Sequence, residues 1–100
     1  MISHKTILIV DDEPMLREAV ASYLEQKGFR VLTADTGSQA MTMFERETIH
    51  FVILDLMLPD VSGEEVCVPL RKSSRVPIAK LLAGWKNRMP GGGHILKTLK

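Results

Sequence analysis

Three aspartates in this chain stand where their side chains can do chemistry together. Asp11 and Asp12 directly follow the apolar run of residues 7–10, and Asp55 follows a second apolar run at residues 51–54. If both runs are neighbouring buried strands of one parallel sheet, the three carboxylates converge at one edge of that sheet. Carboxylate oxygens are the hard ligands that Mg²⁺ prefers, and a carboxylate at such a site can accept a phosphoryl group. The pattern therefore predicts a magnesium site suited to phosphoryl transfer.

The segments around the first two aspartates have the periodicity that would position them. Residues 7–10 are an unbroken aliphatic run, which is typical of a strand covered on both faces. A helix is predicted to begin at Pro14, with Asp12 or Glu13 as its cap, and to stop at Gly28. The apolar positions of this helix recur at helical spacing: Leu16, Ala19, Val20, Tyr23 and Leu24.

The next segments continue the alternation of strands and helices. Residues 29–34 predict a second strand, residues 36–38 open a second helix, and residues 51–54 predict a third strand. A loop rich in turn formers follows, and Ser62 with Glu65 makes a capping box for a third helix. Strands and helices that alternate with short loops indicate right-handed crossovers and a parallel sheet with helices on both faces.

In the later part of the chain the local signals disagree. Pro69 lies inside the third predicted helix, where it would cost about 3 kcal/mol, so that helix is expected to be kinked or short. Residues 77–83 fit a fourth strand, yet residues 78–89 also have the apolar spacing of a helix that the Pro-Gly-Gly-Gly run would end. Both interpretations stay open. Residues 94–99 fit a last short strand.

The composition is that of one small globular domain. The chain has 100 residues, 45% hydrophobic and 25% charged, and no apolar stretch approaches the roughly 20 residues of a membrane helix. The first residues lack the apolar core of a secretory signal, so a cytoplasmic location is expected. The single cysteine, Cys67, excludes an internal disulfide and is expected to be a structural residue on a buried helix face.

Charge is distributed unevenly along the sequence. All 12 acidic residues precede residue 66, and 8 of the 13 basic residues follow it. The late basic residues are dispersed and have no interleaved aromatic residues, which favours a solvated surface over a nucleic-acid interface.

Two motifs carry a resemblance to a known family. The first is Ile-Leu-Ile-Val-Asp-Asp-Glu-Pro at residues 7–14, and the second is Val-Ile-Leu-Asp-Leu-Met-Leu-Pro-Asp-Val-Ser-Gly at residues 52–63. Together they closely resemble the receiver domain of two-component response regulators. The resemblance implies a flavodoxin-like α/β fold, with parallel strands in the order 2-1-3 and helices on both faces of the sheet. Because the later part of the chain departs from the family pattern, we expect this sheet to be incomplete after the third or fourth strand.

The resemblance also implies roles for the acidic residues. Asp55 would be the phosphoacceptor, taking a phosphoryl group from a phosphohistidine on a sensor histidine kinase or a phosphotransfer protein. Asp12 would bind Mg²⁺ directly and Asp11 largely through water, with Asp55 and the backbone carbonyl of Met57 as further ligands. A purely structural interpretation explains less, because capping the helix at Pro14 needs only one acid and does not involve Asp55.

The last quarter departs from the family pattern. Receivers carry a Thr or Ser at the end of the fourth strand, where this chain has Leu82, whose side chain cannot donate a hydrogen bond to a phosphoryl group. They also carry a Lys at the end of the fifth strand, and Lys97 would contact the phosphoryl group or Asp55 there, although a surface lysine fits equally well. We therefore expect residues 5–78 to be receiver-like, residues 79–100 to diverge, and the usual conformational switch to be lost.

The sequence thus favours a single signalling module over residues 1–100. Its leading function is a phosphoacceptor of a two-component phosphorelay, with Mg²⁺ as cofactor and at most self-phosphorylation as enzyme activity. The alternative is a phosphorylation-independent interaction module that dimerises through a sheet edge left exposed by an incomplete fold. No membrane partner is expected, and no DNA-binding role is expected for this chain by itself, because the sequence contains no output domain.

Overall fold

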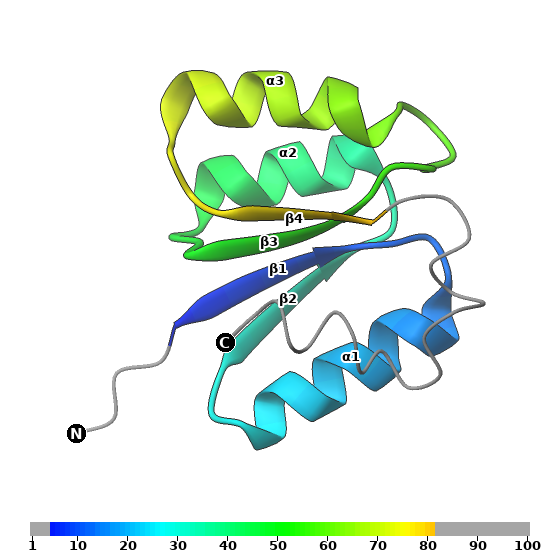
Figure 1. Cartoon of the computed structure of the whole chain (residues 1–100), viewed down its shortest axis with the longest axis vertical. Helices are drawn as coiled ribbons and strands as arrows, with labels where there is room; N and C mark the ends of the chain where they lie inside the picture. Colours follow the sequence, from blue (N-terminus) through cyan, green and yellow to red (C-terminus); the bar gives the residue numbers. More distant parts are fainter. Residues whose placement is uncertain (1–4, 82–100) are drawn as a thin grey trace.

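The computed structural model describes residues 5–81, in which strands and helices alternate along the chain (Figure 1). The elements are β1 (Thr6–Val10), α1 (Pro14–Gln26), β2 (Arg30–Ala34), α2 (Gly37–Arg46), β3 (Phe51–Asp55), α3 (Gly63–Ser73) and β4 (Ile78–Leu81). The three strands predicted at residues 7–10, 29–34 and 51–54 are confirmed, each with one end shifted by a single residue.

The four strands form one parallel sheet in the order β2-β1-β3-β4. This arrangement confirms the flavodoxin-like class and the predicted order of the first three strands. In the register of β1 and β3, Val10 pairs with Leu54. The residues that follow Val10 therefore lie level with Asp55 at the carboxyl edge of the sheet.

The segment that had two interpretations begins as a strand. Residues 78–81 pair in parallel with β3, and Leu81 lies opposite Asp55. The helical interpretation of residues 78–89 is therefore wrong at its start, because pairing with the open edge of β3 satisfies the backbone of this short apolar run. Residues 82–89 lie outside the described residues, as does the strand expected at residues 94–99.

Helices cover both faces of the sheet, with α2 and α3 on one face and α1 on the other (Figure 1). The side chains of β1 alternate between two core clusters. Leu8 and Val10 pack in the cluster that includes residues of α2 and α3, whereas Ile7 and Ile9 pack with Val20 of α1. Burial on both sides explains the unbroken aliphatic run of this strand.

The start of α1 differs from the prediction in one respect. Pro14 lies in the first turn, as expected, and the N-cap position falls on Glu13 and not on Asp12. The side chain of Glu13 makes no capping hydrogen bond, so its predicted capping role is wrong. Instead the N–H of Glu13 donates to Oδ1 of Asp11 over 2.9 Å, which ties the helix start to the acidic edge.

The end of α1 follows the prediction at Gly28. This glycine has a φ of 96°, its N–H donates to the carbonyl of Glu25 over 3.0 Å, and the N–H of Phe29 donates to the carbonyl of Leu24 over 3.1 Å. These two bonds form a Schellman motif, which needs a left-handed residue that glycine adopts without strain. The helix therefore stops where β2 has to begin.

The buried stripe of α1 is narrower than the apolar spacing predicts. Val20 and Leu24 are buried in the core, but Tyr23 is 38% exposed and Ala19 is exposed. The amine of Lys27 lies 5.3 Å from the centroid of the Tyr23 ring. That cation–π contact uses the aromatic face on the solvent side of the helix.

Side-chain caps fix the starts of the other two helices. Thr36 accepts the N–H of Gln39 at its Oγ1 over 3.1 Å, and Ser62 accepts the N–H of Glu65 at its Oγ over 3.2 Å. Such a cap contributes about 1 kcal/mol to the stability of a helix. Both helix starts are therefore confirmed as predicted.

Proline does not end α3. The helix continues through Pro69 to Ser73, so the expectation of a helix cut short is wrong. Val66, Cys67 and Leu70 are buried against the core, whereas Pro69 lies on the exposed side of the helix, so that packing of the buried side offsets the local cost of the proline. Cys67 is thus the buried structural residue that the sequence predicts, and burial raises the pKa of its thiol.

Candidate acidic metal site

The structure brings the three predicted aspartates together at the carboxyl edge of the sheet. Asp11 and Asp12 follow β1, Asp55 ends β3, and one carboxylate oxygen from each lies within 4.8 Å of the others. Asp11 and Asp55 are buried, at 1% and 3% exposure, while Asp12 is exposed. The cluster is therefore open to solvent on the side of Asp12.

The two buried carboxylates are held in the same local way. Oδ1 of Asp11 accepts the N–H of Glu13, and Oδ1 of Asp55 accepts the N–H of Met57, each over 2.9 Å. Each bond runs from an aspartate to the amide two residues later, which is the Asx-turn geometry that short acidic side chains favour. Each turn fixes one carboxylate oxygen of its own aspartate, and with it the orientation of that carboxylate.

Backbone contacts of Asp11 join the end of β1 to β2 and to α1. Its N–H donates to the carbonyl of Ala34 over 3.0 Å, which extends the pairing of β1 with β2. Its carbonyl accepts Nη1 of Arg17 over 2.8 Å, which reaches back from the first turns of α1. The main chain at Asp11 is therefore held from both sides.

The β3–α3 loop, residues 56–62, closes tightly over the end of β3. Met57 and Ser62 form an antiparallel bridge, and the N–H of Gly63 donates to the carbonyl of Leu56 over 3.1 Å. A Cβ at Gly63 would lie 2.6 Å from Cα of Leu56 and 2.8 Å from the carbonyl oxygen of Asp55. Glycine is needed at residue 63 because the backbone of the loop passes too close for any side chain.

Sequence reasoning missed a contact made by Asp60 in the same loop. Its Oδ1 accepts the N–H of Gly37 over 2.9 Å, and its Oδ2 accepts the N–H of Ser38 over 3.0 Å. These bonds, first to Gly37 and then to Ser38, lower the pKa of Asp60 from 3.8 to about 2. An acid after a proline signals a turn, but no local pattern pairs it with a helix 22 residues earlier in the chain.

Acid titration tests the Asp60 contact. Because the folded-state pKa is depressed to about 2, the stabilisation is complete above about pH 4 and is lost as the pH falls through the folded value. As the pH is lowered from about 4 to about 2, we expect the unfolding free energy of wild type to fall more steeply than that of Asp60→Asn. Urea denaturation at closely spaced pH values measures both slopes, and equal slopes would contradict the assignment.

The donor set and its spacing suit Mg²⁺. All three groups supply carboxylate oxygens, and magnesium takes oxygen ligands at about 2.1 Å while keeping several waters, so opposite ligands of its octahedron lie about 4.2 Å apart. Oxygens that all lie within 4.8 Å of one another fit this geometry with small adjustments. A divalent cation would also relieve the mutual repulsion of three carboxylates.

The family is decided by comparison with known proteins. The family model of the response regulator receiver domain matches residues 7–88. The chain belongs to this family. It is a receiver domain of the two-component type.

Several relatives support this assignment. The probable transcriptional regulator ycf27 of Cyanophora paradoxa is 43% identical over 82 residues, which are 82% of this chain and 34% of that protein. The sensory transduction protein RegX3 of Mycolicibacterium smegmatis is 41% identical over 78 residues, 78% of this chain and 34% of that protein. The chain thus spans about a third of the length of these curated relatives.

Solved structures agree with the receiver fold. The response regulator TrrA of Thermotoga maritima, in complex with Mg(2+)-BeF, superposes with a TM-score of 0.74 at 34% identity, covering 89% of this chain and 79% of its own. A complex of the histidine kinase ThkA with TrrA matches with a TM-score of 0.73 at 39% identity, over 79% of this chain and 69% of the other.

Two residues that the receiver pattern singles out lie outside the described residues. They are Leu82, at the position of the usual Thr or Ser, and Lys97, the expected phosphoryl contact. Met57 is described, and its N–H bond to Asp55 places its backbone beside the acidic cluster. Among residues 5–81 of the receiver domain, no helix is long and apolar enough to cross a membrane.

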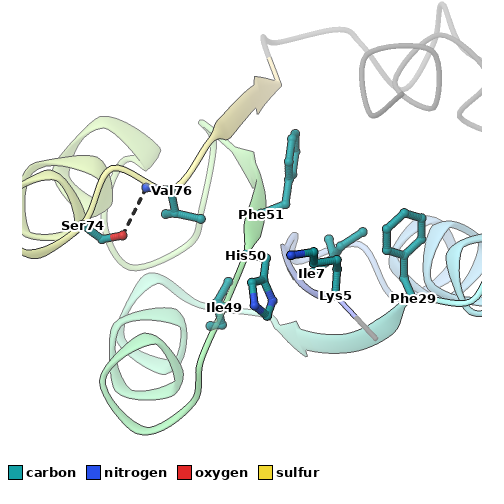
Figure 2. Close-up of a pocket in the computed structure, with 8 residues that line it drawn as sticks. All are labelled: Lys5, Ile7, Phe29, Ile49, His50, Phe51, Ser74 and Val76. Carbon is teal, nitrogen blue, oxygen red and sulfur yellow. Dashed lines mark hydrogen bonds between the residues drawn. The ribbon is translucent and has the colours of Figure 1, made fainter. Parts of the chain in front are cut away.

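A cavity of about 430 Å³ lies at the other end of the strands, where β1 and β3 begin (Figure 2). Its lining is largely apolar and contains no acidic residue: Lys5, Ile7, Phe29, Ile49, His50, Phe51, Ser74 and Val76. Nδ1 of His50 accepts the N–H of Thr6 over 2.9 Å. Since parallel sheets of this class bind ligands at the carboxyl edge, the acidic cluster and not this cavity is the candidate site of the receiver domain.

Proposed function

We propose that this receiver domain is a Mg²⁺-dependent phosphoacceptor module in which Asp55 takes a phosphoryl group from a phosphohistidine of a partner kinase. The observation that carries the proposal is the meeting of Asp11, Asp12 and Asp55 within 4.8 Å at the carboxyl edge of the sheet. Membership of the receiver family adds the reaction class.

The buried position of Asp55 suits it to act as the nucleophile. An oxygen of its carboxylate attacks phosphorus and forms an O–P bond, while the P–N bond to the imidazole breaks and the nitrogen keeps the electron pair and takes up a proton. The Asx turn with Met57 fixes the attacking group, and phosphoryl transfer depends mainly on such positioning and on charge neutralisation. Mg²⁺, when bound, neutralises the charge on the phosphoryl oxygens.

The proposed ligands of Mg²⁺ are the three carboxylates and one backbone group. Asp12, which is exposed, would bind the cation directly, and Asp11, which is buried, largely through water. Asp55 and the backbone carbonyl of Met57 complete the set. Water would fill the remaining positions, as is usual for this cation. Lys97 is proposed as a contact to the phosphoryl group.

The proposal extends to partner, location and domain organisation. The solved complex of ThkA with TrrA is one between a histidine kinase and a response regulator, and we infer a histidine kinase or phosphotransfer protein as the partner of this chain. Its location would be cytoplasmic, and residues 1–100 would form one receiver-like domain. Any enzyme activity would be limited to its own phosphorylation.

Titration calorimetry with Mg²⁺, followed by beryllofluoride in the presence of Mg²⁺, tests the proposed function on the whole chain. We expect saturable Mg²⁺ uptake. We also expect the midpoint of thermal unfolding to be higher with Mg²⁺ and beryllofluoride together than with Mg²⁺ alone, because a ligand that binds only the folded state stabilises it. A titration without Mg²⁺ uptake would overturn the proposal. A stable dimer, with a solution mass that is unchanged by Mg²⁺ and by beryllofluoride, would instead favour the phosphorylation-independent interaction module.

A further inference from the structure

The β3–α3 loop of the acidic site is fastened to a helix that contributes no residue to that site. Both oxygens of Asp60 accept N–H groups from the first turn of α2, those of Gly37 and Ser38. Next to this contact, Val61 packs directly on Gly37, where an added Cβ would lie only 2.3 Å from Cγ2 of Val61. A polar contact and an apolar contact therefore join the loop to α2.

The first turn of α2 is a firm anchor for a carboxylate. The first N–H groups of a helix have no partner within the helix, and the helix dipole places partial positive charge there. Thr36 accepts the N–H of Gln39, and Asp60 accepts those of Gly37 and Ser38. The helix start is thus completed by a residue from a distant loop.

The same loop carries the backbone of the proposed metal site. Met57 donates its N–H to Asp55, and it is bridged to Ser62 across the loop. Asp60 lies between these two positions in the sequence. A displacement of the loop at Asp60 would therefore be passed to Met57, and from there to the carboxylate of Asp55.

We propose that Asp60 is a positioning residue for the acidic site, which holds the β3–α3 loop against the N-terminus of α2 so that Met57 and Asp55 keep the geometry that binds Mg²⁺. This inference rests on the proposed function in its choice of metal. The anchoring of the loop is a separate claim, which is measurable without any metal.

The variant Asp60→Ala is expected to raise the Mg²⁺ dissociation constant about tenfold, in the range found when residues that support metal ligands are removed. In the metal-free chain, the amide hydrogen of Met57 is expected to exchange faster, because the loop opens locally. Asp60→Asn retains an acceptor oxygen for one of the two amides and is expected to lie between Asp60→Ala and wild type in both measurements.

The matched control is Thr36→Ala, which removes the other cap of the same helix but leaves the loop untouched. We expect it to lower thermal stability while leaving the Mg²⁺ dissociation constant and the exchange of Met57 near the wild-type values. The comparison therefore separates a weakened α2 from a displaced loop.

Each outcome bears on one of the two claims. Wild type that takes up no Mg²⁺ overturns the proposed function, while faster exchange of Met57 in Asp60→Ala alone still supports anchoring of the loop. Wild-type binding with equal Mg²⁺ affinities in Asp60→Ala and Thr36→Ala would overturn the positioning role. Unchanged exchange of Met57 in Asp60→Ala would overturn it as well, whatever the metal does.

Discussion

Replacing Asp55 by asparagine is expected to abolish phosphorylation of this receiver domain and its uptake of beryllofluoride with Mg²⁺. An asparagine amide is too weak a nucleophile to accept the phosphoryl group, and it removes one of the three charges that would hold the cation. The fold should persist, because asparagine has nearly the same volume and keeps an oxygen that accepts the N–H of Met57. Mass spectrometry after incubation with phosphoramidate and Mg²⁺ measures the loss.

The control for this variant is Asp35→Asn. Asp35 directly follows β2 at the same carboxyl edge and is exposed, but it is not among the three clustered carboxylates. It loses the same charge, and phosphorylation of this variant is expected to match that of wild type. If Asp55→Asn is phosphorylated to the same extent as wild type, the acceptor lies elsewhere in the chain and the assignment of Asp55 as the phosphoacceptor is refuted.

The acidic cluster could be predicted from the sequence because the rule that creates it is topological. If two apolar runs are neighbouring parallel strands, as the order implied by the receiver resemblance makes them, the acids that end them meet at one edge. The register of Val10 with Leu54 fulfils this expectation. No detail of side-chain packing was needed, since the order and direction of the strands set which ends lie together.

The contacts that the sequence did not reveal depend on tertiary packing. Asp60 reaches Gly37 across 23 positions of sequence, which no local pattern encodes. Pro69 was expected to kink or shorten α3, and the helix is not shortened, because burial of Val66 and Leu70 outweighs the local penalty of a proline that faces solvent. The short apolar run at residues 78–81 fitted the spacing of a strand and also that of a helix. It forms a strand because the edge of β3 is available for pairing.

Replacing Gly63 by alanine is expected to weaken both the fold and the metal site. The added Cβ would lie 2.6 Å from Cα of Leu56 and 2.8 Å from the carbonyl oxygen of Asp55, and backbone atoms cannot turn aside as a flexible side chain can. The loop must therefore shift, at a cost of about 1–3 kcal/mol in unfolding free energy. Urea denaturation measures that cost, and calorimetry measures the accompanying loss of Mg²⁺ affinity.

A second glycine separates the two effects. Gly28→Ala forces a side chain into a left-handed conformation with a φ of 96°, although no atom lies within 4 Å of the new Cβ. It should cost about 1 kcal/mol of stability through backbone strain. Its position between the end of α1 and the start of β2, at the opposite end of the strands from the carboxyl edge, should leave Mg²⁺ affinity unchanged. If Gly63→Ala loses stability but binds Mg²⁺ as tightly as Gly28→Ala does, then the close backbone approach at Gly63 stabilises the fold without shaping the acidic site.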